Sequence, residues 1–377
     1  MPQSMVKHAL KQMFALQSFL FEDDIVESDA LSKLYDVEYW HTLVPESSTD
    51  SSELRSALLS RVMEDSDNNV ASASTLTPSS SVLSDNNAVS SLLREQGYCI
   101  LPPANVAAST AISKLCKELI CIQTALQAEG LPPQFIYVYN APWQLLAEHW
   151  RGPATAALGK DSILEADMNC WALRKRISTP TVEVPYIGAN FAASHRDQIY
   201  SACHDDDGEC TSVNLWTPYN VGGATSENGA MRVLPCTSDD FFYCPDHPLH
   251  LQTSASLDVE GAAEAVVTLT CASGDACLWS PSLIHWGGSC NADATDEPRQ
   301  SLAATFRSAN APRSQFGGGD SKAAAGPGPM ILADLNDLTL QRRLAYVAKG
   351  LLAYSHHFPG FPGLKLAKEH DEMLYRK

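Results

Sequence analysis

Residues 264–281, EAVVTLTCASGDACLWSP, contain two short apolar segments separated by a turn. The first segment is rich in Val and Thr, a Ser-Gly-Asp sequence occupies residues 273–275, and Leu278 and Trp279 lie in the second segment. β-Branched and aromatic residues favour strands, whereas Gly, Ser and Asp favour turns. The stretch therefore predicts two short strands in succession.

The same alternation of short apolar segments and turns continues on both sides of this stretch. Further segments of this kind are TVEVPYIGANF (181–191), TSVNLWTPYN (211–220), GAMRVLP (229–235) and QSLAATFRS (300–308). Many short strands at regular spacing are typical of antiparallel sandwiches and barrels. We therefore expect a mainly β core.

Helical patterns flank this β region. Apolar residues recur at helical spacing over residues 109–126 and again over residues 335–354, which predicts a helix in each place. The segment PPQFIYVYNAPWQLLAEHW, residues 132–150, favours a strand followed by a helix. The expected fold class is thus mainly β with flanking helices.

The first part of the chain has a different composition. Residues 5–21 have the apolar spacing of an amphipathic helix, and residues 46–91 are rich in Ser, Asp, Asn and Thr. A segment so poor in apolar residues buries too little surface to offset the entropy lost on ordering. We predict an N-terminal extension, 1–87, with a helix and a mobile linker, and a main domain, 88–377, that ends in helices.

Composition excludes several classes of protein. The net charge is −18 and the sequence pI is about 4.9, whereas nucleic-acid and anionic-membrane binding need a basic surface. No apolar run is long enough to span a bilayer. The 11 cysteines are odd in number, which argues against a secreted disulfide framework. We expect a cytoplasmic protein with reduced thiols and no nucleic-acid or membrane partner.

Residues 194–210, SHRDQIYSACHDDDGEC, contain two His-x-Asp pairs that are candidates for a metal site. The first pair is His195 and Asp197, and the second is His204 and Asp206. Residues two apart in a strand face the same side, so His195 and Asp197 would point together into a β core. The second pair adjoins consecutive aspartates, which favour a solvated loop.

A third candidate ligand, His285, follows the strand that includes Trp279. Two histidines and one carboxylate leave positions on a metal open, which suits Fe(II) enzymes that bind a co-substrate and oxygen together. Arg299 and Ser301 follow, again two apart, and could bind the distal carboxylate of such a co-substrate. Arg307 is an alternative to Arg299, because an even spacing places both on the same strand face.

The ordered set of motifs resembles the phytanoyl-CoA dioxygenase-like (PhyH) family of Fe(II)/2-oxoglutarate-dependent oxygenases. The set comprises His195-x-Asp197, VNLWTPYN followed by SENGAMRVLP, GDACLWSPSLIHWGG and EPRQSLAATFR, and it covers roughly residues 88–310. The resemblance implies a double-stranded β-helix, also called a jelly-roll or cupin-like core. It also implies that His195, Asp197 and His285 are the catalytic iron ligands and that Arg299, beside Ser301, anchors 2-oxoglutarate.

The activity implied by this resemblance is that of a non-haem iron dioxygenase, an oxidoreductase. With Fe(II), 2-oxoglutarate and O2 it would hydroxylate, or otherwise oxidise, an unactivated C–H bond of a small-molecule substrate. One alternative is a catalytically inactive jelly-roll that binds a ligand. Another is a zinc-dependent hydrolase that uses the same three ligands and a metal-bound water, although it gives Arg299 no role.

Overall fold

The computed structural model describes residues 33–44, 86–159, 162–173, 194–309, 311 and 338–354. Three predicted segments lie outside the described residues: the helix over 5–21, the strand over 181–191 and the greater part of the linker over 46–91. The division of the chain into 1–87 and 88–377 stays a prediction.

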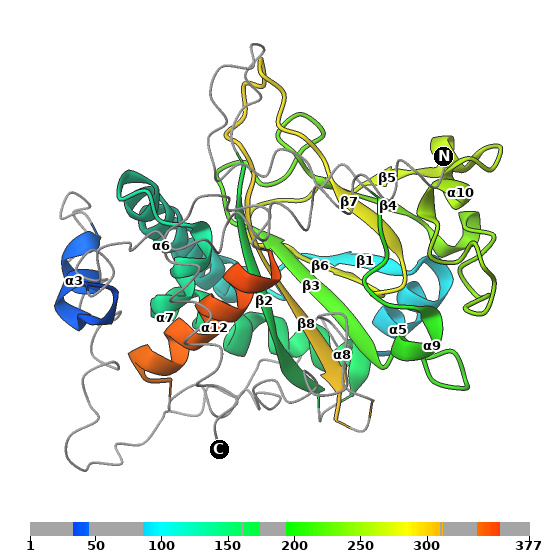
Figure 1. Ribbon diagram of the computed structural model, residues 1–377, viewed down its shortest axis with the longest axis horizontal. Helices are drawn as coiled ribbons and strands as arrows, with labels where there is room; N and C mark the ends of the chain where they lie inside the picture. Colours follow the sequence, from blue (N-terminus) through cyan, green and yellow to red (C-terminus); the bar gives the residue numbers. More distant parts are fainter. Residues whose placement is uncertain are drawn as a thin grey trace, which may run out of the picture.

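Two antiparallel sheets form the core of the protein (Figure 1). The five-stranded sheet has the order β1 (Tyr98–Leu101), β6 (Ala276–Trp279), β3 (Ser212–Pro218), β8 (Gln300–Ser308) and β2 (Ser162–Ala172). The three-stranded sheet has the order β5 (Val267–Thr268), β4 (Met231–Leu234) and β7 (Ile284–Gly287). From β5 to β8 successive strands alternate between the two sheets, as in a jelly-roll, and the predicted fold class is confirmed.

The two faces of the five-stranded sheet pack against two different hydrophobic clusters. Along β3 and β8, Leu215 and Phe306 belong to the large core that the helices share, whereas Trp216 and Ala303 belong to a second cluster with residues of the other sheet. This follows from the two-residue side-chain period of a strand. Because both faces are covered, every residue of β3 is buried, and its inward-facing side chains are available to line a site.

Helices cover the outer face of the five-stranded sheet and its margins (Figure 1). The α-helices are α3 (Val37–Leu43), α5 (Asn86–Gln96), α6 (Val106–Ala128), α7 (Asn140–Gln144), α8 (Arg151–Leu158), α9 (Tyr200–Cys203), α10 (Thr253–Leu257), α11 (Ala262–Ala265) and α12 (Leu340–Ala353). Short 3-10 or π segments are η1 (Lys33–Tyr35), η2 (Pro133–Val138), η3 (Leu145–Trp150) and η4 (Cys236–Ser238). The helices predicted over 109–126 and 335–354 correspond to α6 and α12.

The strand predicted at the start of residues 132–150 is wrong, because Pro133–Val138 form the 3-10 helix η2. All six of its residues are buried, so no polar face marks the helical period. Pro133 at its start fixes a backbone φ angle that suits a helix and supplies no N–H for a strand ladder. A short apolar run buried on all sides cannot be assigned to strand or helix by periodicity.

The described part of the N-terminal region contacts the main core. Trp40 of α3 is 2% exposed and stacks on Phe135 at a ring-centroid distance of 5.6 Å. The Tyr139 hydroxyl donates a 3.0 Å hydrogen bond to the carbonyl oxygen of Trp40. α3 therefore packs on the same helices that cover the five-stranded sheet.

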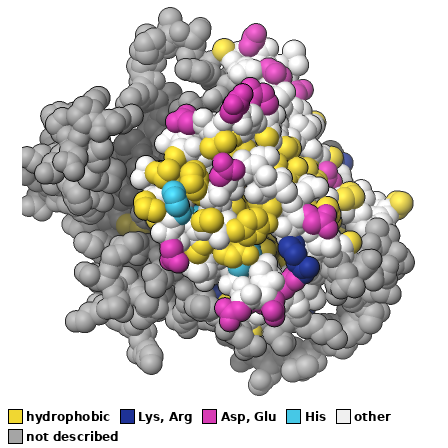
Figure 2. Space-filling view, turned by 90° about the vertical axis from the view of Figure 1, so that its right-hand side faces the viewer, with side chains coloured by type: hydrophobic (Ala, Val, Ile, Leu, Met, Phe, Trp, Pro, Cys, Tyr) yellow, Lys and Arg dark blue, Asp and Glu magenta, His cyan; other side chains and the backbone are white. Residues whose placement is uncertain are grey.

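Among the described residues, no helix is both long enough and apolar enough to cross a bilayer. Figure 2 shows the face on the right-hand side of Figure 1, where acidic side chains lie among scattered apolar groups and basic side chains are sparse. Ile199, Tyr243 and Leu251 are exposed large apolar side chains of the protein. The acidic character of this face agrees with the net charge of −18.

Candidate functional site

His195, Asp197 and His285 form a cluster at the rim of a pocket between the two sheets. The Nε2 atom of His195 lies 3.5 Å from Asp197 Oδ1, and Nε2 of His285 lies 3.4 Å from Asp197 Oδ2. The two imidazole rings are 4.4 Å apart between centroids. Among the described residues, this is the group of His, Cys, Asp and Glu side chains whose ligand atoms come close enough to share a metal ion.

The backbone brings His195 beside His285 although they are distant in sequence. The two residues form an isolated antiparallel bridge with reciprocal N–H to carbonyl hydrogen bonds of 3.1 and 3.0 Å. Asp197 follows in a bend, where its N–H donates a 2.8 Å bond to the Pro281 carbonyl. The expected strand is thus reduced to a bridge and a bend, yet both side chains of the pair still reach the cluster.

The position and charge state of His285 suit a ligand. Its ring Nδ1 lies 2.9 Å from the carbonyl oxygen of Leu283. Because a carbonyl oxygen only accepts hydrogen bonds, Nδ1 carries the proton and Nε2 faces the cluster with a free lone pair. Burial lowers the pKa of His285, and the nearby Asp197 carboxylate opposes this effect. The neutral ring is the form that binds metals.

Asn214 of β3 orients the Asp197 carboxylate. Its Nδ2 donates a 2.6 Å hydrogen bond to Asp197 Oδ2. The Thr305 hydroxyl, directly opposite on β8, donates a 2.8 Å bond to Asn214 Oδ1. The hydroxyl thereby fixes which end of the Asn214 amide faces Asp197. Sequence reasoning missed both residues, because their roles depend on the pairing of β3 with β8.

Arg299 lies at the other end of the same pocket, immediately before β8. Its side chain is 1% exposed, and Nη1 lies 3.3 Å from the Ser301 hydroxyl, to which it donates. The Nε and Nη2 donors are buried and have no hydrogen-bond partner within the described ranges. Burial lowers the pKa of Arg299 to about 10, so the guanidinium is charged at neutral pH and has two N–H donors free for an anion.

Arg307 is placed at the opposite end of β8 and does not line this pocket. Its guanidinium forms an ion pair with Glu165 of β2 and donates a 2.8 Å hydrogen bond to the Ala311 carbonyl. The even spacing predicts the shared strand face correctly, but the length of β8 separates the two arginines. Arg307 is therefore occupied by a structural ion pair.

The second His-x-Asp pair has a different environment. The His204 ring stacks on Tyr200 with centroids 3.9 Å apart, and its Nδ1 donates a 3.1 Å hydrogen bond to the Tyr200 carbonyl. Burial lowers the pKa of His204 to about 4. Asp206 is exposed in the turn that follows. The structure therefore does not bring His204 and Asp206 together with His285.

One side of the pocket is formed by residues that the sequence did not single out. Asn169 and Trp171 of β2 line it, as does Tyr354 at the end of α12. Asn169 donates a 3.1 Å hydrogen bond to the Tyr354 hydroxyl, and the Trp171 and Tyr354 rings meet edge to face at 5.2 Å. Trp279 also lines the pocket.

The cluster fits a single metal ion. One donor atom from each of His195, Asp197 and His285 lies within 4.8 Å of the other two, which is close to the about 4.2 Å that can separate two ligands each about 2.1 Å from one metal. Two imidazoles and one carboxylate are the donor set of non-haem iron oxygenases. The unpartnered N–H groups of Arg299 fit the carboxylate of a co-substrate in the same pocket.

Two antiparallel sheets that enclose such a cluster, with a buried arginine in the same pocket, define a class: jelly-roll enzymes that depend on non-haem iron and 2-oxoglutarate. The chain belongs to the phytanoyl-CoA dioxygenase (PhyH) family, whose model matches residues 93–299. This assignment agrees with the resemblance in the sequence motifs. No curated protein sequence matches the chain.

Several solved structures are similar to this one. The apo form of the non-heme monooxygenase ThoJ has 15% identity and a TM-score of 0.42, with 70% of this chain and 98% of that chain covered. The epimerase SnoN in complex with Fe3+, alpha ketoglutarate and nogalamycin RO has 18% identity and a TM-score of 0.38, with 63% and 93% covered. EctD from S. alaskensis in its apoform has 17% identity and a TM-score of 0.38, with 58% and 75% covered.

Proposed function

We propose that the protein is an Fe(II)- and 2-oxoglutarate-dependent dioxygenase that hydroxylates, or otherwise oxidises, an unactivated C–H bond of a small molecule. The observation that carries the proposal is a single pocket with His195, Asp197 and His285 at one end and the buried, unpartnered N–H groups of Arg299 at the other. A dicarboxylate that binds a metal through one end needs both features in this relationship.

In this proposal His195, Asp197 and His285 hold Fe(II). His285 binds through Nε2, because Leu283 keeps the proton on Nδ1. Asp197 has one oxygen bound to Asn214 and the other oxygen free to bind the metal. When bound, Fe(II) supplies the oxidative chemistry that converts 2-oxoglutarate and O2 to succinate and carbon dioxide as the substrate is oxidised.

Arg299 and Ser301 hold the distal carboxylate of 2-oxoglutarate. The Arg299 Nε and Nη2 donors point to one side of the planar guanidinium, which matches the two oxygens of a carboxylate. Ser301 is fully buried and fixes Arg299 through Nη1. The ring of Trp216 lies 5.5 Å from the Arg299 Cζ atom and helps to exclude water from this end of the pocket.

The substrate in this proposal meets the side of the pocket formed by Trp171, Tyr354 and Asn169. Two aromatic side chains offer apolar contact area, and an amide beside them offers a polar group that orients a ligand. In the pairing of β2 with β8, Trp171 lies opposite Ser301 and Asn169 lies opposite Ala303, so this side of the pocket adjoins the strand with the proposed co-substrate anchor. In this proposal these side chains limit the substrate to a molecule small enough to bind beside 2-oxoglutarate in the same pocket.

The test is release of succinate by purified protein supplied with Fe(II) and 2-oxoglutarate. We expect wild-type protein and the His204→Ala variant to release succinate and His195→Ala to release none. Loss of release in His204→Ala alone would assign the metal to the second His-x-Asp pair. After chelation, restoration of a hydrolytic activity by zinc, with no succinate formed with iron, would contradict the dioxygenase proposal.

A further inference from the structure

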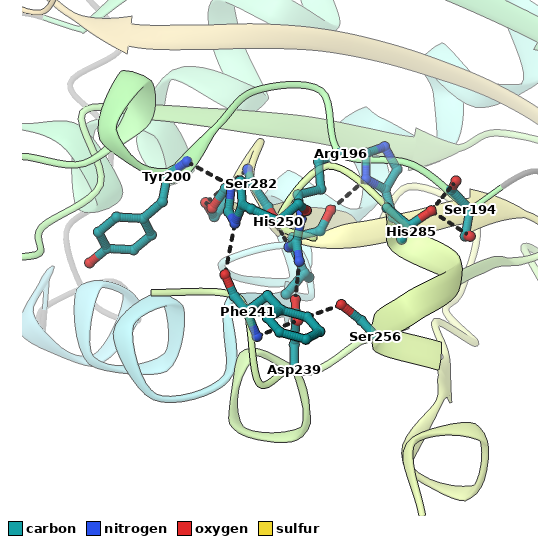
Figure 3. Close-up of polar contacts among 12 residues, drawn as sticks. Ser194, Arg196, Tyr200, Asp239, Phe241, His250, Ser256, Ser282 and His285 are labelled. Atoms are coloured by element: carbon teal, nitrogen blue, oxygen red, sulfur yellow. Dashed lines mark hydrogen bonds and ion pairs between the residues drawn. The ribbon is translucent and has the colours of Figure 1, made fainter. Parts of the chain in front are cut away.

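Arg196 lies between His195 and Asp197 in sequence, but its side chain does not enter the pocket. Because side chains of an extended segment alternate in direction, Arg196 points into the protein where its two neighbours point toward the cluster. It is 9% exposed as a residue, and its guanidinium forms a 2.6 Å ion pair with Asp239 in which both side chains are fully buried. Figure 3 shows the polar contacts around this pair.

The Arg196 guanidinium binds three separate parts of the chain. Nε donates a 2.7 Å hydrogen bond to the His250 carbonyl, Nη1 donates a 2.5 Å bond to the Ser282 carbonyl, and Nη2 donates to Asp239. Ser282 belongs to the turn that leads into β7 and His285. One side chain thus connects the segment with His195 and Asp197 to the segment with His285.

The acceptors of Arg196 are themselves held in place (Figure 3). Asp239 Oδ1 accepts a 2.9 Å hydrogen bond from the Ser256 hydroxyl and a 3.1 Å bond from the Phe241 N–H. The His250 ring donates from Nδ1 to the Phe241 carbonyl at 2.7 Å and accepts at Nε2 from the Tyr200 N–H at 3.3 Å. Any shift of the Arg196 side chain would therefore break several of these hydrogen bonds.

We propose that Arg196 is a positioning residue: together with Asp239, it fixes the segment of His195 and Asp197 against the turn before His285, so that all three can hold one metal ion. The inference rests on the proposed function in taking these three residues as the ligands. A buried ion pair contributes little net stability compared with a well-packed apolar pair, so stability alone does not account for it. Mutation of groups that orient metal ligands typically lowers metal affinity by about 10- to 100-fold.

The test measures metal binding directly and does not depend on turnover. Apo protein is titrated with Co(II), whose visible absorption reports both affinity and coordination geometry. For Arg196→Met we expect Co(II) affinity to fall by about tenfold or more, with an altered absorption spectrum. Arg196→Lys keeps the charge beside Asp239 but cannot reach three acceptors with one ammonium group, so we expect an intermediate loss.

Arg343 provides a matched control far from the cluster. It is 3% exposed, and its guanidinium donates hydrogen bonds of 3.0 and 2.9 Å to the carbonyls of Leu338 and Val138. Arg343→Met therefore removes another buried arginine that binds backbone carbonyls between separate segments. We expect it to lower thermal stability while Co(II) affinity and spectrum stay within twofold of wild type.

The outcomes separate this inference from the proposed function. If wild-type protein binds Co(II) and His285→Ala does not, the ligand assignment stands and the Arg196 variants are informative. Wild-type affinity and spectrum in folded Arg196→Met and Arg196→Lys would then overturn the positioning role alone. If Arg196→Met does not fold, Arg196→Lys and Asp239→Asn decide the question by the same titration. Failure of wild-type protein to bind Co(II) would overturn the proposed function and this inference with it.

Discussion

Asn214 donates a 2.6 Å hydrogen bond from Nδ2 to Oδ2 of Asp197, across the gap between β3 and the bend that follows His195. The donor occupies one lone pair of the carboxylate and turns the other oxygen toward His195. A carboxylate that is held in this way can bind a metal through one oxygen without first reorienting. The relationship makes the cluster depend on a strand of the five-stranded sheet.

Substitution of Asn214 is therefore expected to weaken metal binding. We expect Asn214→Ala to lower Co(II) or Fe(II) affinity by about 10- to 100-fold, because Asp197 loses its orienting donor. The measurement is a metal titration of apo protein. Asn220→Ala is the control, because Asn220 is also buried and donates to the Gly223 carbonyl away from the cluster. Equal metal affinities in the two variants would contradict the role of Asn214.

Arg299 and Arg307 are expected to differ in their effect on the co-substrate. Arg299→Ala removes two charged hydrogen bonds from the proposed carboxylate, which is expected to cost about 3 kcal/mol, or roughly a hundredfold in the Kd of 2-oxoglutarate. Arg299→Lys should recover part of this loss, since an ammonium keeps the charge but lacks the planar fork. Calorimetric titration of metal-loaded protein with 2-oxoglutarate measures both.

Arg307→Ala serves as the comparison on the same strand. It removes the ion pair with Glu165, so we expect lower thermal stability with an unchanged Kd for 2-oxoglutarate. A Kd that rises in Arg307→Ala and stays constant in Arg299→Ala would transfer the anchoring role to Arg307.

Glu118 of α6 is expected to make stability depend on pH. Burial raises the pKa of Glu118 to about 7, and the nearby Lys114 acts in the opposite direction. The folded protein thus holds this proton at a pH where the unfolded chain has released it, so stability falls as pH rises from about 4.5 to about 7. The full loss is about 3 kcal/mol.

The variant Glu118→Gln removes this titration. Its free energy of unfolding, measured by chemical denaturation, should exceed that of wild type at pH 8 by more than it does at pH 4.5. Parallel pH profiles for wild type and Glu118→Gln would show that Glu118 titrates alike in the folded and unfolded chain.

Two adjacent glycines provide a test of backbone packing in the loop between β3 and β4. Gly222 and Gly223 have φ angles of +83° and +74°, so alanine is strained at either position by about 1 kcal/mol or more. A Cβ atom at Gly223 would lie 2.2 Å from the Cys271 carbonyl oxygen, whereas one at Gly222 would meet nothing within 4 Å. The two positions therefore share the strain and differ in the clash.

We expect Gly222→Ala to fold with a modest loss of stability and Gly223→Ala to lose at least about 2 kcal/mol more. The larger loss reflects separation of the bridge between Ala224 and Cys271. Thermal denaturation of the two variants measures the difference. Similar melting temperatures would mean that the Cys271 backbone moves away at little cost.

Much of the β core is predictable from the sequence because its strands are apolar segments and turn-forming residues mark where they end. The strands expected within 211–220, 229–235 and 300–308 correspond to β3, β4 and β8. Each is bounded by Gly, Pro or Asn residues, which seldom continue a strand. Regular alternation along β8 also placed Arg299 and Ser301 on one side, although Arg299 itself precedes the strand.

The order of the motifs was sufficient to bring His195, Asp197 and His285 together as candidates, but not to assign the residues that support them. Asn214 is one polar residue in an apolar strand, and its partners come from β8 and from the bend at Asp197. In the sequence Arg196 looks like an exposed charge. Its burial depends on Asp239, which only the folded chain places beside it. Such roles arise from tertiary pairing and leave no local pattern.

The bridge between His195 and His285 also has a consequence for the time at which the pocket can form. Its two backbone hydrogen bonds join parts of the chain that are synthesised far apart, and contacts of high sequence separation form late because a long loop must close first. On the ribosome, His195 and Asp197 emerge well before β7 and β8. A nascent chain therefore has no complete cluster until β7 has left the ribosome, and a metal ion can meet all three residues only after that point.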